Sequence, residues 1–158
     1  MLDSTIVLVA IATAANGILA GASLDQSIKQ LPARHKIGMI AYSKYSQAAD
    51  LGNGILWYAG IGIGAASLTI AAAVAAYFNG LNTSITTPLY IAAGLAVLHS
   101  LATAQAAPTN FSQQKVDQDE KTLAWVFNRF EKWQTIRAIL QVLNFAVMLW
   151  AMVAFASI

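Results

Sequence analysis

The sequence predicts an all-α integral membrane protein, with residues 1–158 forming a single four-helix bundle. Composition is the first reason: 58% of the 158 residues are hydrophobic and 10% are charged, whereas soluble domains are about 25% charged. The second reason is four apolar stretches, each long enough to cross a bilayer as a helix. We expect them at about residues 5–24, 54–78, 88–106 and 134–157, with a short interfacial helix in the first and third connections.

The stretch at 5–24 is the first predicted span. Its sequence Ala20-Gly21-Ala22 is similar to a signal-peptide cleavage site, but signal peptides begin with a positively charged region. Only Met-Leu-Asp-Ser precedes this apolar run, so we interpret it as a retained helix. Asn16 is its one strongly polar side chain and is predicted to bond to another helix. Gly17 and Gly21 form a face of small residues, which allows close contact between helices. Such a face can also form the contact of a homo-oligomer.

The connection from 25 to 54 is polar at first and then periodic. Pro32 is expected to break any helix that continues from the first span. From Ile37 onward, apolar residues recur at near-helical spacing. This pattern indicates either an amphipathic helix at the membrane interface or an early start of the second span.

The second and third spans follow. Trp57 and Tyr58 open the second span as an interfacial aromatic pair. Pro88 starts the third span, which is acceptable in a first turn, and Pro108 is expected to stop it.

The third connection, residues 113–132, is charged but carries apolar residues that suggest a short interfacial helix: Leu123, Val126, Phe127 and Phe130. The fourth span then presents Arg137, Gln141 and Asn144 on one helical face. An arginine in a spanning helix costs roughly 2.5–3.5 kcal/mol and normally faces a partner or a wet cavity.

Charge placement predicts the orientation. All nine Lys and Arg residues lie in the first and third connections or, for Arg137, just inside the fourth span. The positive-inside rule therefore places both long connections in the cytoplasm and both termini on the non-cytoplasmic side, in the cell (inner) membrane. A net charge of +2 without a basic, aromatic-interleaved patch indicates no nucleic-acid partner.

Polar residues of several spans share the cytoplasmic half of the predicted bundle, below an apolar half. Two interpretations follow. In the structural one, Arg137 is neutralised by Asp50 and the other polar groups bond to each other. In the functional one, the spans form a pocket for a lipophilic small molecule or membrane lipid.

As an enzyme, the pocket would use His99 as a general base, Arg137 to stabilise an oxyanion and Asp50 to orient either. The residues expected to bind substrate are Asn53, Trp57, Thr103, Asn110, Trp133 and Gln141. No cofactor is expected. The chain has no cysteine, and one His and one Asp within the membrane are few ligands for a metal ion or a haem. The alternative is a binding, transport or scaffold subunit without chemistry.

Two short motifs carry a family resemblance. Pro108-Thr109-Asn110 after the third span and Trp133-Gln-Thr-Ile-Arg137 at the start of the fourth resemble the four-helix integral membrane family that includes the anthrone oxygenases. The resemblance implies a small membrane protein and, as in some members, cofactor-independent oxidation of a polycyclic phenol. It covers Asn110, Trp133 and Arg137, and it does not assign Asp50 or His99.

Overall fold

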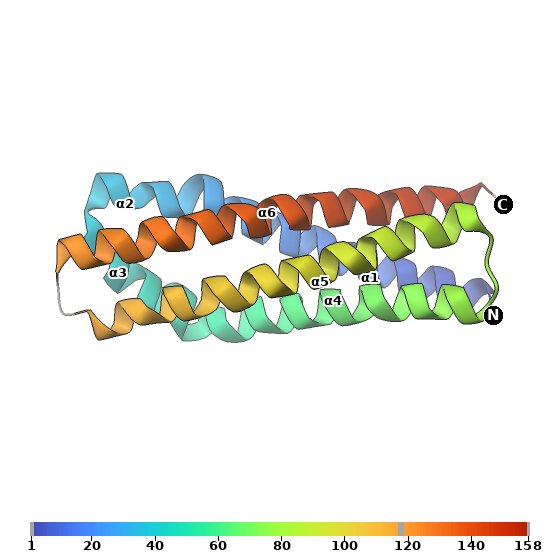
Figure 1. Ribbon diagram of the computed structural model, residues 1–158, viewed down its shortest axis with the longest axis horizontal. Coiled ribbons are helices and arrows are strands. Elements are labelled where there is room, and N and C mark those ends of the chain that lie inside the picture. The colour runs from blue at the N-terminus through green and yellow to red at the C-terminus, as the bar shows by residue number, and fades with distance from the viewer. Residues whose placement is uncertain (1, 117–118, 158) are drawn as a thin grey trace.

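The computed structural model describes residues 2–116 and 119–157, which form an elongated bundle of four long helices (Figure 1). No strand occurs within these residues. Four helical runs are long and apolar enough to cross a membrane: Ser4–Ile37, Met39–Phe78, Thr83–Lys115 and Glu120–Ala156. The predicted all-α class with four long apolar helices is therefore confirmed.

The first run is longer than its predicted span. Helix α1 (Leu2–Asp25) continues through a π-helical turn, η1 (Gln26–Gln30), into α2 (Leu31–Ile37). The prediction that Pro32 breaks the helix was wrong. Pro32 lies in the first turn of α2, where a missing N–H costs little, and the Leu31 N–H bonds to the Gln26 carbonyl across the π turn. The run ends at Gly38, whose φ of 88° favours glycine.

The second run contains the stretch after Ile37. Helix α3 (Met39–Ala48), the π-helical turn η2 (Ala49–Asn53) and α4 (Gly54–Phe78) follow each other without a separate loop. The stretch is thus helical and leads into the second long helix, and its position relative to the membrane interface stays a prediction. A kink at Gly52, with φ −91° and ψ −117°, separates the two parts.

Helix α5 (Thr83–Ser112) includes both Pro88 and Pro108 and is followed by the 3-10 turn η3 (Gln113–Lys115). The prediction that Pro108 stops this helix was wrong. Polar side chains commonly bond to helix carbonyls near a proline in apolar helices. Pro108 lacks the N–H that would bond to the Ala104 carbonyl, and the Thr109 hydroxyl donates to the next carbonyl, that of Gln105, at 3.1 Å.

Helix α6 (Glu120–Ala156) is continuous, so the segment around Leu123–Phe130 is its first part and not a separate helix. Asp119 caps it by accepting bonds from the Thr122 hydroxyl and the Lys121 N–H. These hydrogen bonds, that of Thr122 first, hold the pKa of the Asp119 carboxyl below its usual value.

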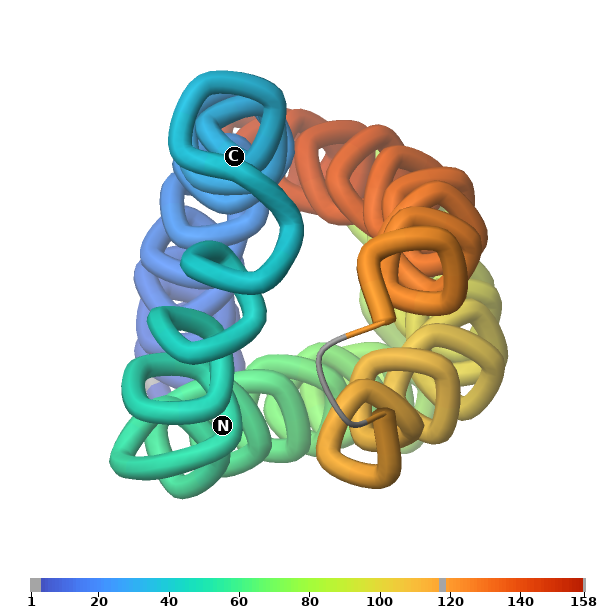
Figure 2. Tube along the Cα trace, turned by 90° about the vertical axis from the view of Figure 1, so that its left-hand side faces the viewer, coloured from blue at the N-terminus to red at the C-terminus, as the bar shows by residue number. Residues whose placement is uncertain are grey.

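The four helices form a ring in which each packs on two neighbours, in the order α1, α4, α5, α6 (Figure 2). Both termini lie at one end of the bundle, while α2, α3 and the α5–α6 connection lie at the other (Figure 1). We call these the terminal end and the connection end. An apolar cluster including Val9, Leu89 and Met148 fills the terminal end. A second cluster, including Leu31 and Phe127, fills the connection end.

Candidate functional site

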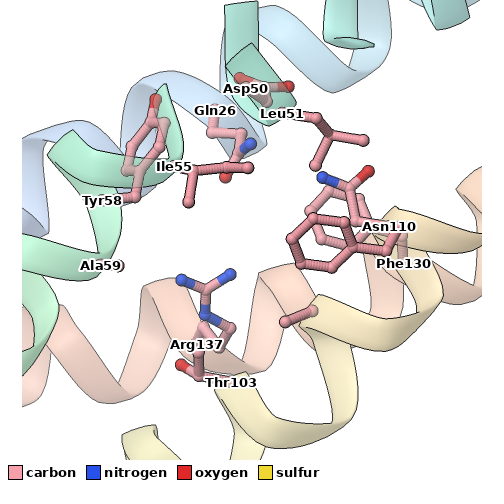
Figure 3. Close-up of a pocket in the computed structure, with 12 residues that line it drawn as sticks. Gln26, Asp50, Leu51, Ile55, Tyr58, Ala59, Thr103, Asn110, Phe130 and Arg137 are labelled. Carbon is pink, nitrogen blue, oxygen red and sulfur yellow. The ribbon is translucent and has the colours of Figure 1, made fainter. Parts of the chain in front are cut away.

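A cavity of about 150 Å³ lies toward the connection end and is lined by side chains from all four long helical runs (Figure 3). Of the twelve residues that line it, six are polar or charged and six are apolar. The polar residues are Gln26, Asp50, Tyr58, Thr103, Asn110 and Arg137, and the apolar ones are Leu51, Ile55, Ala59, Ala107, Phe111 and Phe130. Such a mixture suits a small lipophilic molecule that is oriented by a few polar contacts.

Arg137 enters this cavity from α6, and its guanidinium points into the open space (Figure 3). One terminal nitrogen, Nη1, donates to Gln134 Oε1 at 2.8 Å. The Nε atom is buried and has no hydrogen-bond partner. Arginine has five N–H donors in a planar fork, so most of its donor capacity is not used by these contacts.

The predicted pairing of Arg137 with Asp50 was wrong. The two salt bridges within residues 2–116 and 119–157 join Lys29 to Asp25 and Arg34 to Glu131. Asp50 and Arg137 instead lie on opposite sides of the cavity (Figure 3). The physical reason is the direction in which each side chain points around the bundle. The turn η2 directs the Asp50 carboxylate toward α3 and η1, where other side chains donate hydrogen bonds to it.

Asp50 is buried, with 7% of its surface exposed. Its carboxylate accepts a hydrogen bond from the Ser46 hydroxyl at 2.9 Å and interacts with the Gln26 side chain. The negative charge is therefore held by a hydroxyl and an amide. This leaves the positive charge of Arg137 without a carboxylate partner in the described part of the chain.

Gln113 organises the wall of the cavity nearest the connection end. It is fully buried, and its Nε2 donates to Asn110 Oδ1 at 2.7 Å and to the Ser46 hydroxyl at 3.2 Å. Its Oε1 accepts from the Ser43 hydroxyl at 3.1 Å. These bonds tie α5 and η3 to α3, which fixes Asn110 beside the cavity.

His99 lies near Arg137, close enough for their charges to interact. It is buried at 4% exposure, and its Nε2 has no hydrogen-bond partner. It is not, however, among the residues that line the cavity. The structure therefore brings the predicted base beside the predicted oxyanion-stabilising group without placing it against the ligand space.

The other predicted site residues divide by position. Thr103 and Asn110 line the cavity. Trp133 lines a separate apolar groove between α5 and α6, and Trp57, 56% exposed, and Asn53 lie on the outer surface.

Gln141 belongs to a polar network closer to the terminal end. The Asn16 side chain donates to Thr69 Oγ1 at 2.8 Å, and its Oδ1 accepts from Gln141 at 2.8 Å and from Asn144 at 3.0 Å. The predicted interhelical bonding of Asn16 is thus confirmed. Together with the apolar cluster beyond it, this network separates the cavity from the terminal end of the bundle.

The lining or supporting residues that were missed from the sequence include three polar ones: Gln26, Tyr58 and Gln113. Gln26 could have been found from spacing, because Asn16, Ser23 and Gln26 recur on one face of a helix that continues past residue 24. The break expected at Pro32 concealed this continuation. In the interfacial aromatic pair Trp57 was chosen as the site residue and Tyr58 was not, and Gln113 belonged to a charged connection that did not indicate a site.

Within the residues that the structure describes, no group of three or more His, Cys, Asp or Glu side chains could hold a metal ion. No protein-family model, curated protein or solved structure matches this chain. The resemblance to the anthrone oxygenase family therefore stays a prediction from its two short motifs.

Proposed function

We propose that this protein is an integral membrane protein that binds a lipophilic small molecule carrying an acidic oxygen. The observation that carries the proposal is the Arg137 guanidinium, which lines the cavity without a carboxylate partner among the described residues. Arg137 is partly buried, with its Nε atom fully buried, and an arginine inside an apolar helix is stabilised by an anionic partner. A carboxylate, phenolate or enolate oxygen of the ligand would supply that partner.

The lengths of the helices support a membrane location for the cavity. Helix α6 has 37 residues and is about 55 Å long, whereas the hydrocarbon core of a bilayer is roughly 30 Å thick. Arg137 lies about 25 Å from the start of α6. The part of α6 that follows Arg137 is about as long as the hydrocarbon core is thick, so the boundary of that core would lie close to Arg137. The cavity would then lie at the hydrocarbon boundary and extend from Arg137 toward the connection end.

Surface chemistry agrees with this placement. Large apolar side chains stand exposed around the bundle, including Leu56 at 83%, Phe78 at 80% and Val153 at 64%, which is expected for contact with lipid. The basic residues lie toward the connection end, so the positive-inside rule would place that end in the cytoplasm. The segments α2, α3 and the start of α6 would then lie at the cytoplasmic membrane surface.

Proton abstraction is a second candidate function, favoured by the Asp50 carboxylate that lines the same cavity. Asp50 would accept a proton from a phenol or an acidic C–H group, and Arg137 would stabilise the resulting oxyanion. Oxidation by dioxygen, which the family resemblance implies, would start from that anion. This candidate requires that Asp50→Asn retains ligand but loses turnover.

The binding proposal is tested by what the protein retains after mild detergent extraction. Mass spectrometry of solvent extracts should find an acidic lipophile with the wild type and with Lys132→Gln, a change to an exposed basic residue on the same helix. Arg137→Gln should lose it by roughly tenfold or more, because hydrogen bonds to charged groups contribute about 1.5–3 kcal/mol. Equal retention by all three proteins, or neutral lipid alone, would contradict the proposal.

A further inference from the structure

We infer that the ligand is a single-tailed amphiphile whose acidic head fills the cavity, and that it enters sideways from the bilayer between α4 and α5. This inference rests on the proposed function, because it assumes that Arg137 holds an acidic group. It adds the size of the head, the path of the tail and the residues that form the entrance.

The volume of the cavity limits the size of the ligand's head group. A protein cavity of about 150 Å³ accommodates one benzene-sized molecule, and the cavity beside Arg137 has about that volume. A carboxylate or a single phenol ring therefore fits inside. A fused polycyclic ring system or a long chain does not, so the remainder of a lipophilic ligand has to leave through an opening.

The opening lies between α4 and α5. Ile55 and Ala59 on α4 and Phe111 on α5 line the cavity, yet Ile55 is 36% exposed, Phe111 is 41% exposed and Ala59 is also exposed. Side chains that line the cavity and also reach the outer surface mark its rim. This rim is apolar and, in the proposed membrane orientation, lies where the headgroup region meets the acyl chains of lipids.

Two lining residues away from this rim do not reach the outer surface. Phe130 on α6 and Gln26 on η1 line the cavity but are buried, at 3% and 5% exposure. Gln113 and its hydrogen bonds close the connection end, and the Asn16 network closes the terminal end. Polarity therefore rises from the rim at Ile55 to the charge at Arg137, which matches an amphiphile with its head inside.

Two sources supply this chemistry: a fatty acid and a phenol with one long alkyl or isoprenoid tail. Each can be tested in lipid nanodiscs with a photoactivatable diazirine in the tail, as palmitic acid and as a 4-alkylphenol. After irradiation, mass spectrometry should place the adducts on the α4 segment containing Ile55 and Ala59 and on the α5 segment containing Phe111. Labelling by both, or by one alone, identifies which head the site accepts.

Blocking the entrance provides a matched pair of variants. Ala59→Phe fills the rim, whereas Ala71→Phe adds the same side chain at an exposed alanine of α4 that does not line the cavity. We expect Ala59→Phe to reduce labelling by about tenfold, equivalent to about 1.4 kcal/mol, and Ala71→Phe to leave it unchanged. Unaltered melting temperatures of both variants would show that the bundle remains folded.

The outcomes separate this inference from the proposed function. Adducts that depend on Arg137 but map to the α5–α6 groove around Trp133 would overturn the entrance while keeping the acid-binding cavity. Full labelling of Ala59→Phe would overturn it in the same way. Equal labelling by the methyl ester and the acid, unchanged by Arg137→Gln, would overturn the proposed function together with the inference.

Discussion

At the scale of single residues, Arg34 is the clearest case of a charge placed by tertiary packing. It is 1% exposed, and its Nη2 donates to Glu131 Oε2 at 2.6 Å and to Asn128 Oδ1 at 3.2 Å. Its Nη1 donates to the Leu31 carbonyl at 2.7 Å. These bonds tie α2 to α6 at the connection end, outside the cavity.

The two partners of this ion pair should differ when they are replaced. Glu131→Ala leaves Arg34 buried without its counterion and should cost about 3–5 kcal/mol. Arg34→Met leaves only Glu131, whose side chain is 39% exposed and can be hydrated, so we expect roughly 1 kcal/mol or less. Thermal unfolding in detergent measures both changes, and a larger loss for Arg34→Met would contradict this asymmetry.

The sequence identified Arg137 because charges inside apolar spans are rare, whatever the fold, and Asp50 because it stands just before the start of one. It could not pair them correctly, because depth along a helix does not determine the direction in which a side chain points around the bundle. Both lie at similar depth, yet the cavity separates them. His99 illustrates the same limit, since it reaches the right depth near Arg137 but is not among the residues that line the cavity.

At the scale of elements, the lengths of the apolar stretches predicted the four long helices, but they did not predict where these helices begin and end. Pro32 and Pro108 are helix breakers by local rules, but a π turn and a first-turn position accommodate Pro32. Pro108 lies within α5. Whether a helix accommodates a proline depends on the neighbouring carbonyls and helices, and the helix propensities of single residues do not include these.

The kink between α3 and α4 is the element that carries Asp50 and Leu51 to the cavity, and it depends on Gly54. A Cβ atom at Gly54 would lie 2.5 Å from the Ala49 carbonyl oxygen, whereas one at Gly60 would meet nothing within 4 Å. Gly54→Ala should therefore destabilise the protein by about 1–3 kcal/mol and weaken ligand retention.

Gly60→Ala is the matched control on the same helix. It should be neutral or stabilise the protein by up to about 1 kcal/mol, because alanine favours helix formation over glycine. Melting temperatures and the amount of retained ligand are measured for both variants. Equal effects of the two substitutions would show that the kink does not require a glycine.

At the scale of the whole molecule, both termini and the α4–α5 turn share one end, and the charged connections share the other (Figure 1). The cavity lies toward the charged end, and the Asn16 network and the apolar cluster close it from the terminal end. This arrangement suits a blind pocket filled from the side, and it does not provide a path across the bundle.

The orientation can be measured directly because the chain has no cysteine. Single cysteines at the exposed positions Asn82 and Ser157 should react with a membrane-impermeant maleimide in right-side-out vesicles. Cysteines at the exposed positions Lys36 and Gln114 should react only after permeabilisation, because the basic connections are expected in the cytoplasm. Gln113 is unsuitable for this purpose because it is fully buried. The reverse pattern would invert the topology and put the cavity near the outer surface, and labelling of all four positions from one side would contradict membrane crossing altogether.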